Sequence, residues 1–294
     1  MNSTSLPLSD DRLAPLVTAY AEAQAAKTRS HLLGFGALLV CILFSAYVAE
    51  VDGRKFVSNI SNFTTYLSRL FYLENTQPVW SDFSEWFWGF GKWFTKIIET
   101  LLIAYLGTIV GAVGAFVACF LAARNLVDSR MLVFVMRRLL EICRTVPELV
   151  FALTFVVAFG LGPLPGILAL AIHTFGALGK QFAEVVENID LKPFEGVSST
   201  GATWTEAVRF AALPQVLPNF VSYGLMRFEI NVRGAAIMGF VGAGGIGQDL
   251  LEAVRKFYYS DVSAMLVMII ATVMVIDYTT EKIRHRLLGH GGAR

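Results

Sequence analysis

The stretch LVFALTFVVAFGLGPLPGILALAIHTFGALG, residues 149–179, contains no Asp, Glu, Lys or Arg. A helix needs about 20 mainly apolar residues to cross the hydrocarbon core of a bilayer. The stretch is longer than one span needs, so it can contain parts of two helices. The sequence GLGPLPG at residues 160–166 interrupts it with two prolines and three glycines, which favour a tight turn. We therefore predict two membrane-spanning helices, one on each side of this turn.

The rest of the chain is also typical of a membrane protein. Hydrophobic residues make up 55% of the 294 residues and charged residues only 16%. Further apolar stretches occupy residues 32–49, 100–123, about 217–241 and about 262–278. The sequence therefore predicts an all-α membrane protein with about six transmembrane helices.

The distribution of Lys and Arg predicts the orientation of these spans. If the N-terminus is cytoplasmic, 15 of the 24 Lys and Arg residues fall in cytoplasmic segments and seven in external ones, and cytoplasmic loops carry such an excess. We therefore expect both termini inside, with a cytoplasmic N-terminal segment over 1–30 and a tail over 281–294. The net charge of +1 argues against nucleic acid as a partner.

Between these ends we predict a first span with an external segment over 31–96 and a transmembrane core over 97–280. The external segment includes WSDFSEWFWGFGKWF, residues 80–94. Tryptophan prefers the headgroup region, so we expect an amphipathic helix on the outer membrane surface. An aromatic cage that stacks on a substrate is the alternative.

The sequence VGAGGIG, residues 241–247, matches the glycine spacing of a dinucleotide-binding turn. It lacks the expected context, because no strand precedes it, no convincing soluble helix is predicted after it and no acidic residue lies at 264–267. We interpret these glycines as positions of close backbone approach. GALGKQ, residues 176–181, also fails as a phosphate-binding loop, so no cofactor is expected in this chain.

Residues 184–216 are too polar to span a membrane and too long for a simple turn. We predict short helices over 195–210, with Trp204 and Phe210 available to a hydrophobic groove on a partner. An ordinary loop helix is the alternative. Pro214 and Pro218 are expected to fix the entry into the next span.

This loop resembles the cytoplasmic coupling loop of ABC importer permeases, which reads E-A-A, three residues, G, nine residues, then I-x-L-P. Glu195, Gly201, Leu213 and Pro214 occupy matching positions, and the resemblance implies that they and Trp204 couple the chain to an ATPase. The sequence departs from the pattern in two places, where Gly-Val replaces Ala-Ala at 196–197 and Ala replaces Ile at 211.

A closer resemblance, to the phosphonate-import permeases of the PhnE type, covers residues 137–250. It is carried by LPQVLPNF (213–220), RFEINVR (227–233) and GFVGAGGIG (239–247). The resemblance implies a type I permease core in a bacterial inner membrane, working with a cytoplasmic ABC ATPase dimer, an external substrate-binding protein and a second permease copy. ATP and magnesium would then bind the ATPase, and this chain would be no enzyme. An importer of another small solute such as methionine, or a secondary transporter, is the alternative.

Burying a charged residue inside a span is costly unless the charge is paired or hydrated. Charged residues in a predicted span are therefore candidates for the substrate path. Glu229 and Arg233 are four residues apart and Arg227 and Asn231 form a second step on another helix face. Guanidinium groups match phosphonate or phosphate oxygens in pairs of hydrogen bonds. The alternative is that Glu229 and Arg233 neutralise each other or stabilise a dimer interface.

His173 lies in the apolar sequence LALAIHTFGALG, where it could face the translocation path or bond to a carbonyl of a neighbouring helix. Arg144 and Glu148 are also four residues apart, and we expect a structural ion pair between them.

Overall fold

The computed structural model describes residues 10–74 and 76–289, which fold into helices and turns with one isolated antiparallel bridge between Tyr72 and Pro78. The predicted N-terminal segment and tail reach into residues 1–9 and 290–294, which lie outside the described residues. A boundary between two compact units falls after Thr65.

The first unit contains α1, Asp10–Val48, and most of α2, Gly53–Arg69. The predicted first span lies within α1, in which Thr18–Val48 is apolar enough to cross a membrane. The described part of the predicted N-terminal segment continues the same helix. A turn of four residues then leads into α2.

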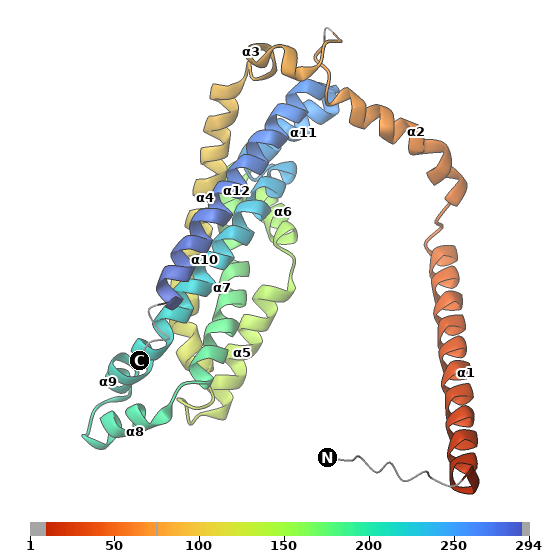
Figure 1. The fold of residues 1–294 in the computed structure, drawn as a ribbon. Helices are drawn as coiled ribbons and strands as arrows, with labels where there is room; N and C mark the ends of the chain where they lie inside the picture. Colours follow the sequence, from red (N-terminus) through yellow and green to blue (C-terminus); the bar gives the residue numbers. More distant parts are fainter. Residues whose placement is uncertain (1–9, 75, 290–294) are drawn as a thin grey trace, which may run out of the picture. The chain divides into compact units, whose positions relative to one another are not determined.

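The second unit is a bundle of long helices with short helices at its two ends (Figure 1). Its elements are η1 (Val79–Ser81), α3 (Phe83–Trp86), α4 (Phe90–Ala122), α5 (Arg130–Thr145), α6 (Glu148–Phe159), α7 (Pro163–Glu187), α8 (Leu191–Ser199), α9 (Trp204–Ala207), the π-helical turn η2 (Val208–Ala212), α10 (Leu213–Met238), the 3-10 turn η3 (Gly239–Val241), α11 (Ile246–Lys256) and α12 (Tyr259–Gly289).

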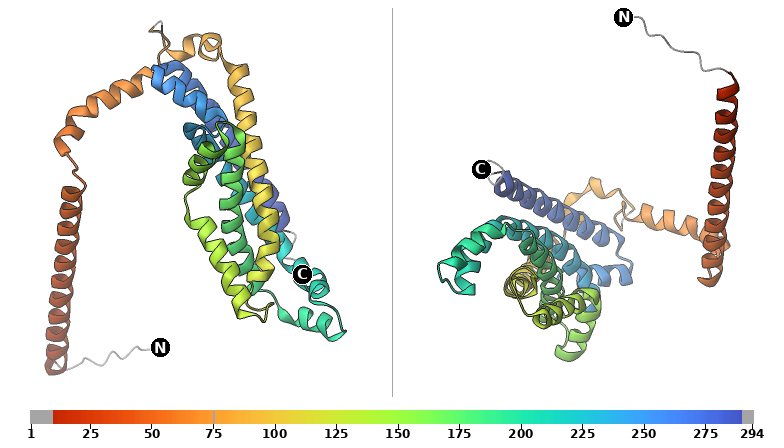
Figure 2. Two further views of the ribbon diagram at one scale, coloured as in Figure 1. Left: turned by 180° about the vertical axis from the view of Figure 1, so that it is seen from behind. Right: turned by 90° about the horizontal axis from the view of Figure 1, so that it is seen from below.

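Helices α4, α7 and α10 pack against one another, and α12 packs on α10 (Figure 2). Small residues permit the closest approaches, because a side chain would separate the helices. A methyl group on Gly111 of α4 would lie 2.6 Å from the carbonyl oxygen of Ala171 of α7. One on Gly176 of α7 would lie 2.6 Å from the backbone nitrogen of Arg144 of α5.

Three described helices are long and apolar enough to cross a membrane, or five spans result if each of two bent helix pairs is one span. The three are Thr18–Val48, Phe90–Ala122 and Tyr259–Arg286. The prediction of about six spans counted the residues before the 160–166 turn as one full span and those after it as another. The span before the turn was wrong, because α6 has 12 residues and covers about 18 Å, too little to cross a membrane alone.

Helices α5 and α6 instead form one of the bent pairs, with an angle of 83° between them. The predicted turn after α6 is present, with positive φ angles of 86° at Gly160 and 142° at Gly162. Pro163 then begins α7, where its missing N–H leaves no helical bond unmade.

The Trp-rich stretch is not the continuous amphipathic helix that the sequence predicted. It forms the short helix α3, a turn and the first residues of α4. Its indole groups bond to the start of α12: Trp86 Nε1 donates to Ser263 Oγ at 3.0 Å and Trp88 Nε1 to Asp261 Oδ1 at 2.9 Å. These polar contacts to a neighbouring helix hold the stretch against the bundle.

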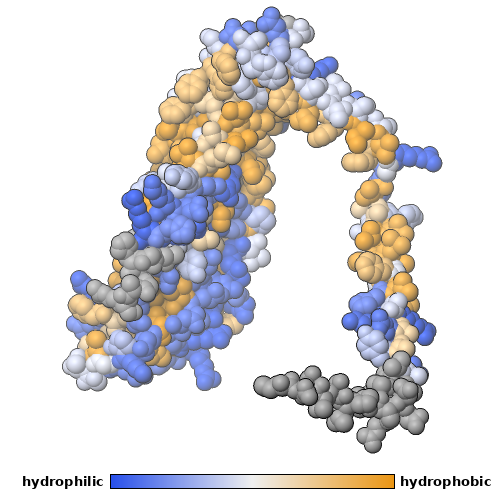
Figure 3. Space-filling model, viewed as in Figure 1, coloured by the Kyte–Doolittle hydropathy of each residue, from blue (hydrophilic) through white to orange (hydrophobic). Residues whose placement is uncertain are grey.

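On the face shown in Figure 3, apolar side chains cover much of the upper half of the bundle, below its polar tip, and polar side chains gather over the half that carries α8 and α9. The core under the polar end contains Phe182 of α7 and Phe220 of α10, whose rings stack with centroids 4.0 Å apart. This stacking holds the C-terminal end of α7 against the start of α10. The predicted coupling loop connects these two ends.

Candidate functional site

Residues 184–216, here called the coupling segment, fold into a helical hairpin at one end of the bundle (Figure 1). Asp190 caps α8 by accepting a hydrogen bond from the backbone N–H of Lys192 at 3.1 Å. Gly201 has a φ angle of +88°, a conformation that glycine adopts without strain. The chain therefore reverses at Gly201 and re-enters the bundle through α9.

The second half of the hairpin is fixed by Thr203 and Glu206. The backbone N–H and the hydroxyl of Thr203 both donate to Glu206 Oε2, each at 2.7 Å. These hydrogen bonds lower the pKa of Glu206, so its carboxylate keeps its charge at the start of α9.

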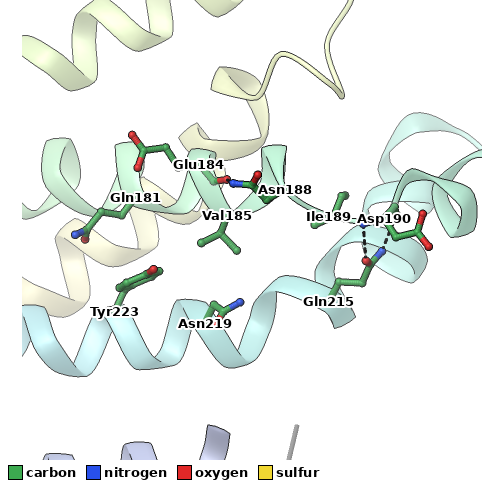
Figure 4. Close-up of a pocket in the computed structure, with 9 residues that line it drawn as sticks. All are labelled: Gln181, Glu184, Val185, Asn188, Ile189, Asp190, Gln215, Asn219 and Tyr223. Atoms are coloured by element: carbon green, nitrogen blue, oxygen red, sulfur yellow. Dashed lines mark hydrogen bonds between the residues drawn. The ribbon is translucent and has the colours of Figure 1, made fainter. Parts of the chain in front are cut away.

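Two contacts join the hairpin to the membrane helices. Trp204 Nε1 donates to the carbonyl oxygen of Leu126, between α4 and α5, at 2.8 Å. Asp190 and Gln215 exchange two hydrogen bonds of 3.1 Å, and these link the start of α8 to the start of α10 (Figure 4). A polar groove of about 440 Å³ lies beside them, between α7 and α10. Asp190 and Gln215 were not predicted from the sequence, because they lie far apart in it and belong to no recognisable motif.

The coupling residues that the resemblance named lie on this hairpin or directly after it. Glu195 on α8 and Pro214 in the first turn of α10 are exposed, while Leu213 is half-buried against the core. Trp204, which was expected to be available to a partner, uses its indole N–H within the chain and remains 39% exposed. Phe210, at 64% exposure, remains accessible.

A second group of functional candidates lies inside the bundle and is called the polar cluster. Its members are Thr108 of α4, Glu148 of α6, His173 and Thr174 of α7, and Arg227 and Asn231 of α10. Asn231, 1% exposed, donates from Nδ2 to the hydroxyl oxygens of Thr108 and Thr174, both at 2.8 Å. Asn231 therefore joins three helices through one side chain.

Arg227 lies one helical turn from Asn231 and its side chain is 11% exposed. Its Nε donates to Thr174 Oγ1 at 3.4 Å, and one of its terminal nitrogens, Nη2, lies 3.9 Å from Glu148 Oε2. That nitrogen and Asn231 Oδ1 are buried without a hydrogen-bond partner. The polar cluster thus has one unused donor on a cation and one unused acceptor, and buried groups of this kind are costly unless a ligand or a structural change uses them.

His173 and Glu148 complete the polar cluster. His173 Nδ1 lies 3.2 Å from the carbonyl oxygen of Val146 and 3.7 Å from Glu148 Oε2. The contact with Val146 matches the predicted bond to a neighbouring carbonyl. The expected pair between Arg144 and Glu148 is wrong, because α6 bends away from α5 and places Glu148 against His173 and Arg227.

The other two charged residues of α10 bond to α12. Arg233 makes two hydrogen bonds of 2.7 Å to the carboxylate of Asp277, and Glu229 accepts a hydrogen bond from Thr280. The alternative in which Glu229 and Arg233 neutralise each other is therefore wrong, because each bonds to α12. Spacing of four residues placed both on one face of α10, but that face meets α12, which supplies better-placed partners.

The glycine sequence at 242–247 forms a tight turn and not a nucleotide site. Gly242, Gly244 and Gly245 have positive φ angles of 86°, 86° and 78°. Contrary to the sequence prediction, a helix does follow, α11. Its first backbone N–H groups are already used, since Gly245 N–H donates to Glu99 Oε1 at 3.1 Å and Ile246 N–H to Thr100 Oγ1 at 2.9 Å. The position that a phosphate would need is filled by α4.

The predicted close backbone approach at these glycines is confirmed. A methyl group on Gly239 would lie 2.5 Å from the Cα of Gly247, so the backbones of η3 and α11 touch. Long apolar helices, a buried polar cluster and an exposed helical hairpin together define the class of the chain: a helical membrane protein with polar contacts inside the bundle and at its end.

Comparison with known proteins identifies the family. Residues 114–281 match the family of binding-protein-dependent transport system inner membrane components. The chain is 36% identical over 269 residues to the phosphite transport system permease protein PtxC of Stutzerimonas stutzeri, covering 87% of this chain and 94% of that protein. It is 40% identical over 191 residues to the phosphate-import permease protein PhnE of Mycolicibacterium smegmatis, covering 65% of this chain and 36% of that protein.

The fold has counterparts among solved structures. A chain of the MetNI methionine ABC transporter in an inward-facing conformation aligns with a TM-score of 0.59 and 21% identity, covering 66% of this chain and 95% of that one. At this identity the likeness concerns the fold alone. The protein belongs to the family of binding-protein-dependent transport system inner membrane components, and it is a permease subunit and not an enzyme.

Proposed function

We propose that this chain is the membrane subunit of an ATP-driven importer that moves phosphite, phosphonate or a related phosphorus oxyanion into the cell. The observation that carries the proposal is the similarity to a phosphite permease, which extends over 87% of this chain. The buried guanidinium of Arg227 supports it, because guanidinium groups match tetrahedral oxyanions through paired hydrogen bonds.

The substrate path in this proposal passes the polar cluster. Arg227 offers an unpartnered donor and Asn231 an unpartnered acceptor, so an oxyanion that carries a proton could bond to both. His173 lies beside them against Glu148. Glu229 and Arg233 have a different role, because they bond to Thr280 and Asp277 and hold α12 against α10.

The coupling segment transmits the action of ATP in this proposal. When two cytoplasmic ATPase subunits close on ATP, they would displace the exposed hairpin around Glu195 and Gly201. Trp204 would carry the displacement to the α4–α5 turn through Leu126, and Leu213 and Pro214 would carry it directly into α10. The membrane helices would then alternate between inward-open and outward-open arrangements.

The assembly in this proposal contains two copies of this chain, an ABC ATPase dimer and an external substrate-binding protein in a bacterial inner membrane. Both termini would face the cytoplasm, on the same side as the coupling segment. The excess of Lys and Arg in the segments that this orientation places inside supports it. Specificity would rest largely on the binding protein, with the polar cluster admitting oxyanions.

The test is ATP hydrolysis by the complex that co-purifies with this chain, reconstituted in lipid with its binding protein. The binding protein is loaded with phosphite, 2-aminoethylphosphonate, phosphate or methionine. We expect stimulation by one of the phosphorus oxyanions and none by methionine. Stimulation by methionine alone would contradict the substrate class, and a chain that purifies without an ATPase would favour a secondary transporter.

A further inference from the structure

Helix α2, Gly53–Arg69, has two chemically distinct faces that the proposed function does not use. Its apolar residues recur at the spacing of one helix face: Phe56, Ile60, Phe63 and Leu67, with Val57 at the edge. These five side chains are 45–72% exposed. Figure 3 shows the apolar residues along one edge of the helix and polar residues along the other.

The opposite face is polar and basic. Ser58, Asn62 and Thr65 lie along it, and Arg54, Lys55 and Arg69 are its charged residues. The helix contains no acidic residue. Asp52, just before it, caps its first turn by accepting hydrogen bonds from the N–H groups of Arg54 and Lys55 at 2.9 and 3.2 Å.

We propose that α2 lies flat on the membrane surface at the end of α1, with Phe56, Ile60, Phe63 and Leu67 in the lipid and Arg54 and Lys55 among anionic headgroups. Helices with an apolar face, a basic polar face and low overall hydrophobicity bind membranes in this way. The sequence prediction assigned such a role to residues 80–94, and the structure shows the required pattern in α2 instead.

The connection to α1 supports the bilayer as the occupant of this face. Helix α1 ends at Val48 and α2 begins at Gly53, and four intervening residues extend to at most about 14 Å. The apolar end of a membrane-spanning helix thus keeps the start of α2 close to the headgroup region. Interfaces with partners that dock and leave are only about as apolar as the rest of a protein surface, whereas the stripe formed by Phe56, Ile60, Phe63 and Leu67 contains no polar side chain.

The proposal can be tested with spin labels on the full chain, reconstituted in vesicles with its ATPase. Cys41, Cys119 and Cys143 are first replaced by Ala. Single cysteines are then introduced by Ile60→Cys and Phe63→Cys on the apolar face, with Ser58→Cys and Asn62→Cys as matched controls one helix face away. Collision rates with oxygen, which concentrates in lipid, and with a nickel chelate, which stays in water, report the depth of each label.

We expect the ratio of oxygen to nickel collisions to be several-fold higher at positions 60 and 63 than at 58 and 62. The contrast should be larger in vesicles that contain phosphatidylglycerol than in pure phosphatidylcholine, and Arg54→Gln with Lys55→Gln should remove that difference. Equal ratios at all four positions would overturn the proposal. So would labels at 60 and 63 that leave water only when the loaded binding protein is added, because the face would then bind that protein. The result is independent of which solute is imported.

Discussion

Trp204 of α9 donates its indole N–H to the backbone carbonyl of Leu126 at 2.8 Å, and this bond joins the exposed hairpin to the turn between α4 and α5. We predict that Trp204→Phe, which keeps the ring and removes the donor, weakens substrate-stimulated ATP hydrolysis several-fold. Loss of the hydrogen bond should lower the free energy of unfolding by only about 1 kcal/mol. ATPase assays in lipid and thermal unfolding in detergent measure the two effects.

The matched control is Trp86→Phe. Trp86 also uses its indole N–H for one hydrogen bond, to Ser263 Oγ at 3.0 Å, but it belongs to α3, and α3 lies at the end of the bundle away from the hairpin (Figure 1). We expect a similar loss of stability and normal stimulation. If both variants reduce stimulation equally, Trp204 has no special part in coupling.

Gly201 provides a second test of the hairpin, because its φ angle of +88° disfavours any side chain. A methyl group there would meet open space, so Gly201→Ala affects only the backbone, by about 1 kcal/mol. We predict that the turn between α8 and α9 changes and that ATPase coupling falls, while membrane insertion stays normal. Gly201→Asn should be milder than Gly201→Ala, since asparagine tolerates this conformation.

Gly196→Ala is the control for this prediction. Gly196 lies inside α8, with open space at its Cβ position and no positive φ angle. The substitution should stabilise α8 by about 0.5–1 kcal/mol and leave coupling intact. Normal uptake by Gly201→Ala and Gly201→Val variants would contradict the assignment of this hairpin to coupling.

The sequence predicted the class of fold and the positions of its elements, but not the contacts between helices. Apolar stretches set where α1, α4, α10 and α12 lie, because the hydrocarbon core requires long apolar helices. The turn at 160–166 followed from its Gly and Pro residues. The length of α6 did not follow, since an apolar run shows no bend until its neighbours are known.

Contacts inside the bundle could be predicted only in part. The spacing of Glu229 and Arg233 shows that they share a face of α10, but nothing in that spacing shows that the face meets Asp277 and Thr280 of α12. Glu148 was likewise assigned to Arg144, its near neighbour in sequence. Its actual partners are His173 and Arg227, which depend on how α6 bends.

The glycine turn predicts a steric effect on stability. A methyl group on Gly247 would overlap the carbonyl oxygen of Ala236 and lie 3.0 Å from the Cα of Gly239, and both of these are backbone atoms. We expect Gly247→Ala to lower the free energy of unfolding by about 3 kcal/mol or more, because a backbone clash cannot be relieved by a rotamer change. Gly224→Ala on α10, with open space around it, should be neutral or stabilising. Thermal unfolding in detergent would compare the two, and equal melting temperatures would contradict the prediction.

Substitutions in the polar cluster can distinguish a structural role of Arg227 from a role in transport. Arg227→Met leaves the Glu148 carboxylate, 28% exposed, without its cation and should lower the free energy of unfolding by about 2 kcal/mol. Adding Glu148→Gln removes the uncompensated charge and should restore stability without restoring oxyanion-stimulated ATP hydrolysis. The control pair, Arg233→Met with Asp277→Asn, removes an ion pair that is half exposed and should leave stimulation close to normal. If the Arg227→Met and Glu148→Gln double variant transports normally, the guanidinium of Arg227 serves only to hold α6, α7 and α10 together.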